Sequence, residues 1–144
     1  MNRNIAFAVL LVWAALLGAC SSMESMMGAG SSSSLPATLT KQLGVNDAQA
    51  AGGTGAILAF AQQRLAAGDF DLIAKAIPGS EKYLGLAKQL LGGASVNDKA
   101  GLQSAFSKLG MSPDMLNKFA PIVTDYVGKT GGDQASKLLA GLLK

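Results

Sequence analysis

The chain has 144 residues, of which 49% are hydrophobic, 6% are aromatic and 15% are charged, with a formal net charge of +3. The near balance of scattered lysines and acids excludes a strong nucleic-acid footprint, and the lack of histidine removes the commonest general base and metal ligand. The single cysteine excludes a disulfide within one chain, so the composition predicts one small aliphatic domain that is not an enzyme.

The N-terminal segment has the pattern of a secretory signal peptide. A short polar start is followed by an apolar run from Ile5 to Leu17, which is too short to cross a bilayer comfortably. Two small residues, Gly18 and Ala19, then lead directly to Cys20. The predicted signal peptide therefore covers residues 1–19.

The end of this segment resembles a bacterial lipobox. Leu17, Gly18, Ala19 and Cys20 match that motif, which implies cleavage before Cys20 and a covalent diacylglycerol and N-acyl lipid on it. Several acyl chains anchor a protein to a membrane far more strongly than one. Ser21, in place of an aspartate, resembles the Gram-negative signal for the outer membrane, so we expect the domain to face the periplasm. An ordinary signal peptide, or an uncut anchor helix with a chance cysteine, is the alternative.

Residues 20–34 are expected to form a tether after the lipidated cysteine. They are rich in serine, glycine and methionine, with too little bulk at any regular spacing to pack. A flexible coil of this length separates its ends by about 20 Å. The folded domain is then predicted to cover residues 35–144.

Within this domain apolar residues recur at helical spacing, without a convincing strand pattern. Asn46, followed by Gln49, has the pattern of a capping box, which predicts a helix that ends at Gly68. Asp69 is expected to begin a shorter helix that the Pro78-Gly79 pair stops. Further helices are predicted from a cap at Ser80 to Gly92, from Asn97 to Gly110, and from Ser112 through Val127 with a bend or shortening near Pro121. After Gly131-Gly132, Asp133 is expected to cap a last helix.

These signals predict an all-α fold, a compact bundle of about six or seven short helices. Leu43–Asp47 can also be aligned with Leu109–Pro113, and a helix follows each segment. Two related helical hairpins would explain this similarity, but so would the general way in which helices start and stop.

Glycines at Gly52, Gly53 and Gly55 surround Thr54 and invite comparison with a phosphate-binding loop. No strand precedes them, and no Lys-Ser or Lys-Thr pair follows at the required spacing. Each glycine costs about 1 kcal/mol in a helix interior relative to alanine, so several together need a reason. Close approach of another helix is the favoured reason.

Four segments resemble a family of bacterial proteins. They are Leu43–Val45, Ala50–Leu58, Phe70–Gly79 and Phe106–Pro113. They look like the VcgC/VcgE family of uncharacterised proteins, and the resemblance covers nearly all of residues 35–144. It rests on glycine positions and apolar spacing, so it implies a small helical envelope domain without an assigned activity.

Two non-enzymatic functions remain as predictions. The first is a structural or protein-interaction module of the cell envelope, which docks on another envelope protein or on itself through Gly52, Gly53, Gly55 and Leu58. The alternative is a carrier of a small apolar ligand such as a lipid, held between helices and lined by Leu84, Phe106, Phe119, Ile122 and Tyr126. No catalytic residue, metal site, resident cofactor or nucleic-acid partner is predicted.

Overall fold

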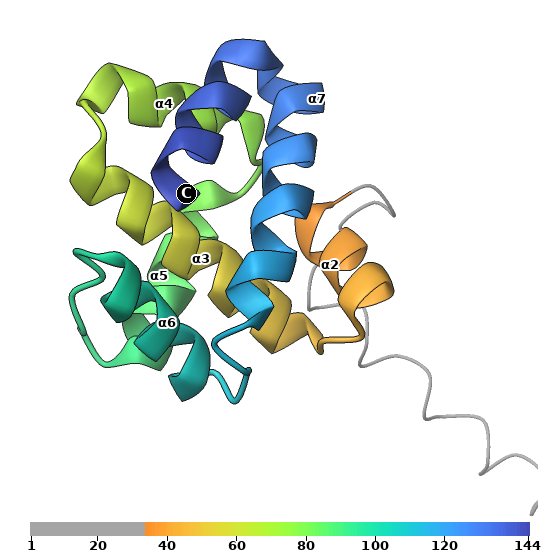
Figure 1. The fold of residues 1–144 in the computed structure, drawn as a ribbon, viewed down its shortest axis with the longest axis vertical. Helices are drawn as coiled ribbons and strands as arrows, with labels where there is room; N and C mark the ends of the chain where they lie inside the picture. Colours follow the sequence, from red (N-terminus) through yellow and green to blue (C-terminus); the bar gives the residue numbers. More distant parts are fainter. Residues whose placement is uncertain (1–33) are drawn as a thin grey trace, which may run out of the picture. The chain divides into compact units, whose positions relative to one another are not determined.

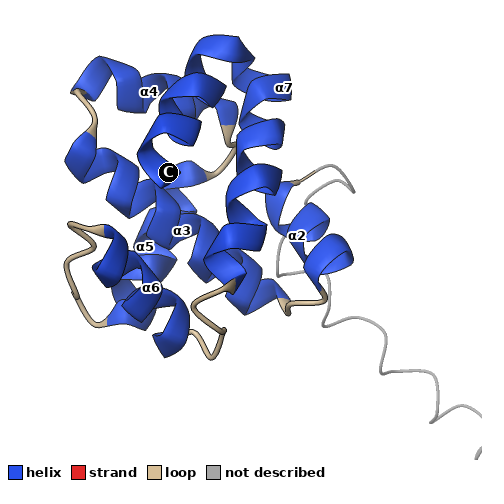
Figure 2. Cartoon of the chain, in the orientation of Figure 1, coloured by secondary structure: helices blue, strands red, loops and turns tan. Residues whose placement is uncertain are grey.

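The computed structural model describes residues 34–144, which form six helices and no strand in that range (Figures 1 and 2). The helices are α2 (Leu35–Leu43), α3 (Asp47–Arg64), α4 (Ala67–Ala76), α5 (Ser80–Leu91), α6 (Lys99–Lys108) and α7 (Met115–Leu143). The predicted all-α class is confirmed. The predicted signal peptide, the lipobox with Cys20, and the tether up to residue 33 lie outside the described residues.

Local signals place the start of α3 correctly. The Asn46 side chain accepts a hydrogen bond from the Gln49 backbone N–H at 2.8 Å, and the Gln49 side chain accepts one from the Asn46 N–H at 3.1 Å. Both halves of the predicted capping box are therefore present, and they satisfy two helix-terminal donors. The cap fixes where the central helix of the domain begins.

Other helix boundaries differ from the prediction. Gly68 does not end α3 but lies in the first turn of α4, where a glycine disrupts little of the hydrogen-bonded helix. Ser80 is the first residue of α5 and makes no side-chain cap. The cap of α6 is Asp98 rather than Asn97, because the Asp98 side chain accepts a hydrogen bond from Gly101 N–H at 2.6 Å.

Helix α2 was not predicted, although its sequence carries two ordinary signals. Pro36 lies in its first turn, where the missing N–H has no helical partner to lose. Gly44 ends it in the left-handed conformation with φ +67°. Leu35 and Leu39 are fully buried, so this short helix contributes to the core.

Helix α7 continues through Pro121, so the predicted shortening at that residue is wrong. Its non-helical backbone instead lies at Gly132, with φ 86° and ψ 173°, where one helix was expected to end and the next to begin. We call residues 115–131 the N-terminal arm and residues 133–143 the C-terminal arm. The chain reverses at Gly132, and the two arms lie side by side (Figure 1).

Helix α3 is the centre of the described domain, with α2, α4, α5, α6 and α7 all packed against it (Figure 1). Ten of its residues are buried, including Ile57, Leu58 and Phe60. Phe106 of α6 and Phe119 of α7 meet edge to face, with ring centroids 5.0 Å apart. Such pairs add to the free energy gained from burial alone. Within residues 34–144, no helix combines the length and hydropathy needed to cross a membrane.

Candidate functional site

The glycine-rich segment of α3 faces another helix of the same chain. A Cβ atom on Gly55 would overlap the backbone carbonyl oxygen of Tyr83 and lie 2.8 Å from the Ala87 Cβ. Gly52 would similarly meet Leu109 Cδ2 at 2.8 Å, and Gly53 would meet Phe119 Cε1 at 2.7 Å. The prediction that close helix packing explains these glycines is confirmed most clearly at Gly55, where the neighbour is the backbone of α5.

The same contacts overturn the predicted docking face. Gly52, Gly53, Gly55 and Leu58 are all buried, with Leu58 at 0% exposure, so they cannot present a surface to another protein. The small-residue stripe lies inside the domain because α5, α7 and Leu109 cover it. A docking surface must therefore be sought on residues that remain exposed.

The predicted ligand space between helices is also wrong. The rings of Phe106 and Phe119 are fully buried and pack directly against each other, so they fill the space in which a ligand would lie. Leu84 packs partly buried against the core. Two of the five predicted lining residues, Ile122 and Tyr126, instead line a groove at the surface.

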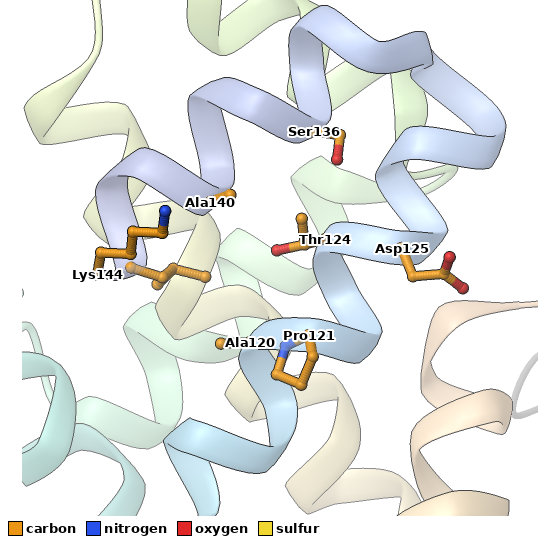
Figure 3. A pocket seen from close by; sticks show the side chains of 8 residues that line it. Ala120, Pro121, Thr124, Asp125, Ser136, Ala140 and Lys144 are labelled. Carbon is orange, nitrogen blue, oxygen red and sulfur yellow. The ribbon is translucent and has the colours of Figure 1, made fainter.

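One surface groove lies between the two arms of α7, and we call it the arm groove (Figure 3). Its volume is about 390 Å³. The lining is mostly small or apolar and consists of Ala120, Pro121, Thr124, Asp125, Ser136, Ala140, Leu143 and Lys144. Asp125 lies in the N-terminal arm and Lys144 directly follows the C-terminal arm, so the arm groove combines a mostly small or apolar lining with one charge of each sign.

A second groove, the α2 groove, lies between α2 and the N-terminal arm of α7. Its volume is about 440 Å³, and its lining contains more polar atoms. The lining residues are Thr38, Gln42, Pro121, Ile122, Asp125, Tyr126 and Lys129. Pro121 and Asp125 line both grooves, so the two grooves flank one exposed surface of α7. We call this surface, formed by Pro121, Asp125 and Lys129, the ridge.

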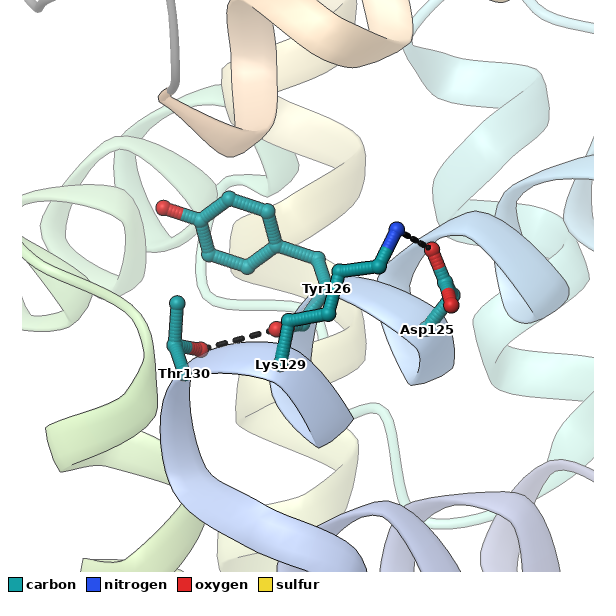
Figure 4. Close-up of polar contacts among 4 residues, drawn as sticks. All are labelled: Asp125, Tyr126, Lys129 and Thr130. Atoms are coloured by element: carbon teal, nitrogen blue, oxygen red, sulfur yellow. Dashed lines mark hydrogen bonds and ion pairs between the residues drawn. The ribbon is translucent and has the colours of Figure 1, made fainter.

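The ridge carries an ion pair and a side-chain hydrogen bond. Lys129 Nζ lies 2.7 Å from Asp125 Oδ2, and both side chains are largely exposed, at 73% and 66% (Figure 4). Thr130 Oγ1 donates to the Tyr126 carbonyl oxygen at 2.8 Å (Figure 4). An exposed pair of this kind adds about 0.3–0.5 kcal/mol to stability, so both charges remain available to a partner.

Pro121 adds a backbone acceptor to the ridge. Proline has no N–H, so the carbonyl of Asn117 lacks the donor that a helix would normally supply. Pro121 is itself exposed and presents an apolar ring between the two grooves. The sequence carried a signal for this ridge, since Pro121, Asp125 and Lys129 follow one another at the four-residue spacing of a helix face.

Other titratable groups in residues 34–144 include the Tyr83 phenol and the acids at helix starts. Burial raises the pKa of the Tyr83 phenol above its ordinary 10.0, and the nearby Tyr126 phenol raises it further, so Tyr83 stays neutral at physiological pH. Asp47 and Asp69 lie in first helical turns, where the helix dipole favours an acid, and Asp98 caps α6. Among residues 34–144, no group of three or more metal-ligating side chains is placed to hold a metal ion.

Comparison with known proteins identifies a family. A family model described as protein of unknown function VcgC/VcgE (DUF2780) matches residues 17–144. No curated protein and no solved structure matches the chain significantly. The matched range begins at Leu17, so it contains the four residues of the predicted lipobox as well as the whole helical domain.

Proposed function

We propose that this chain, which belongs to the VcgC/VcgE family of proteins of unknown function, is a lipid-anchored protein of the bacterial cell envelope. Its helical domain acts as a protein-interaction module. The observation that carries the proposal is the sequence Leu17-Gly18-Ala19-Cys20 at the end of an apolar leader, because it supplies an anchor at a defined residue. The covalent diacylglycerol and N-acyl lipid on Cys20 hold the domain at a membrane.

The extent of the family match supports the anchor. The match spans residues 17–144, so the four residues of the predicted lipobox lie within it together with the helical domain. Ser21 after the cysteine favours the outer membrane, with the domain in the periplasm.

The ridge on α7 supports docking to another protein. Stable interfaces place an apolar centre inside a polar rim, and aromatic residues are enriched there. Pro121 and Ile122 are apolar, Tyr126 is aromatic, and Gln42 and Lys129 supply polar groups around them. Because the interior of the domain is filled by its own side chains, this ridge is the surface that we propose for the partner.

A small apolar ligand remains the alternative, and the arm groove favours it. A volume of about 390 Å³ lies within the range of about 300–1,000 Å³ typical of small-molecule sites, and its lining is mostly apolar. Native mass spectrometry of the purified protein separates the two functions. An apolar mass bound at fixed stoichiometry, and lost on Ala140→Glu, would favour a carrier. A ligand-free species would favour docking.

The anchor is tested by changing the cysteine and its neighbour separately. Cys20→Ser should abolish the incorporation of labelled palmitate and leave the precursor uncleaved, since the thiol is the lipid acceptor. Ser21→Asp should keep the lipid but move the protein from the outer to the inner membrane fraction. Unchanged labelling of the Cys20→Ser protein would contradict the anchor.

The docking surface is tested by photo-crosslinking in living cells from two exposed positions. A photoreactive residue at Gln42, beside the ridge, should yield a discrete adduct with an envelope protein. The same residue at Ser104, exposed on α6, is the matched control and should yield none. Asp125→Arg should remove the Gln42 adduct without lowering the amount of protein. Equal adducts from Gln42 and Ser104 would refute the proposed surface.

A further inference from the structure

Two adjacent glycines make the sharp reversal within α7 possible. Gly132 has φ 86° and ψ 173°, a backbone conformation that is essentially restricted to glycine. A Cβ on Gly131 would lie 2.5 Å from the Cβ of Ala76 in α4, so this position also excludes a side chain. The folded-back arrangement of the two arms therefore depends on both glycines, each for its own reason.

The C-terminal arm covers apolar surface of the rest of the domain. Ala135 and Leu139 are fully buried, and Leu138, Leu142 and Leu143 pack partly buried against the core. An arm that opened in an isolated molecule would expose both this stripe and the surface beneath it, which is unfavourable. The face beneath the arm already fits one partner, which is an arm with the same sequence.

Little besides this apolar contact opposes an exchange. The only non-helical backbone in α7 is at Gly132, so one residue's change to helical φ and ψ would join Met115–Leu143 into a continuous helix of 29 residues. Glycine adopts either backbone conformation without a steric penalty. At the far end of the arm, Lys99 Nζ donates to the Lys144 carbonyl oxygen at 3.0 Å, an exposed contact that an exchanged arm could repeat.

We propose that Gly131-Gly132 is a hinge, and that a second copy of this chain binds by exchange of the C-terminal arm. In the exchanged dimer each arm lies on the other copy's α7 and α4, with the contacts that it makes within one copy in the structure. Short hinges between packed elements are the usual sites of such exchange. This inference does not depend on the lipid anchor or on the ridge partner.

One contact between the arms reports the exchange directly. A Cβ placed on Gly128 would lie 3.3 Å from the Cβ of Ser136, close to the separation of about 3.5–4.5 Å found in disulfides. Two differently tagged copies of the full chain are expressed together, one with Gly128→Cys and the other with Ser136→Cys. After oxidation, a bond between the two introduced cysteines of unequal copies reports that the arm of one copy lies on the other.

Three companions control this experiment. Each single variant expressed with the parent chain, which carries only Cys20, sets the background from that cysteine. A single chain with both new cysteines should close the bond internally, which verifies the geometry. Gly141→Ala, on the exposed side of the C-terminal arm with no atom within 4 Å of its added Cβ, is the matched control for substitutions at the hinge.

The native hinge should give a crosslinked pair above background that increases with the expression level. Gly132→Ala should raise the crosslinked fraction about five-fold or more, because an L residue is strained at this φ but not in a straight helix. Gly141→Ala should leave the fraction unchanged. The proposal is overturned if neither the native protein nor Gly132→Ala gives a crosslinked pair of unequal copies while the double-cysteine chain closes its bond internally. If the Gly132→Ala protein fails to accumulate, the native hinge at the highest expression level decides in the same way.

Discussion

Substitution of Gly55 by alanine tests the packing at the centre of the domain. An added Cβ would overlap the backbone of α5 at Tyr83 and lie 2.8 Å from the Cβ of Ala87, so two helices must separate. Overpacking a core costs about 1–3 kcal/mol, and overlap with backbone places Gly55→Ala at the upper end. About 1 kcal/mol of this cost is offset, because alanine favours the helical conformation more than glycine does. The expected net loss is about 2 kcal/mol.

Two other glycines supply a graded series for the same measurement. Gly52→Ala meets only the movable ends of Leu109 and Leu90, so its cost should nearly cancel the helix gain. Gly141→Ala meets nothing and should stabilise the domain by about 0.5–1 kcal/mol. The assay is urea and thermal unfolding, followed by circular dichroism, of the chain from residue 20 with Cys20→Ser. A loss of about 2 kcal/mol should lower the Tm by about 8 °C. A Gly55→Ala protein as stable as Gly141→Ala would refute the packing argument.

Three further predictions concern the cap, the aromatic pair and alkaline pH. Asn46→Ala removes the capping box of α3 and should cost about 1 kcal/mol in urea unfolding, whereas an unchanged midpoint would exclude a role for the cap. Phe119→Ala leaves a cavity beside Phe106 and should cost about 3–5 kcal/mol, and a loss below 1 kcal/mol would contradict close packing of the rings. Because the folded state raises the pKa of Tyr83, its neutral form stabilises the fold below pH 10, and this contribution is lost as pH rises further. The Tm of Tyr83→Phe should therefore fall less steeply between pH 9 and 11 than that of the parent, and parallel curves would refute this.

The all-α fold class and the start of α3 could be predicted because their sequence signals are local. Asn46 and Gln49 contact each other within one turn, so their spacing alone specifies the box. Gly68 misled the prediction because a glycine is tolerated in a first helical turn as well as at a helix end. Pro121 misled it because a proline on the exposed side of a helix removes a hydrogen bond without breaking the helix.

The candidate site could not be predicted because it depends on which surfaces meet. The glycines of α3 indicate that another helix packs closely against it, but the sequence alone does not show whether that helix belongs to the same chain. Tyr83 and Ala87 of α5 provide the answer only in the folded domain. Likewise, the grooves beside Pro121 depend on the direction in which the chain reverses at Gly132 and on the position of α2. The apolar pattern of α7 specifies neither.

The proposed anchor is tested most directly by mass spectrometry of the protein extracted from bacterial membranes with detergent. We expect the chain to begin at Cys20 and to carry the added mass of a diacylglyceryl group, with a further acyl group on the amino terminus. A chain that still begins at Met1, or one with an unmodified Cys20, would contradict the account of this protein as a lipid-anchored envelope protein.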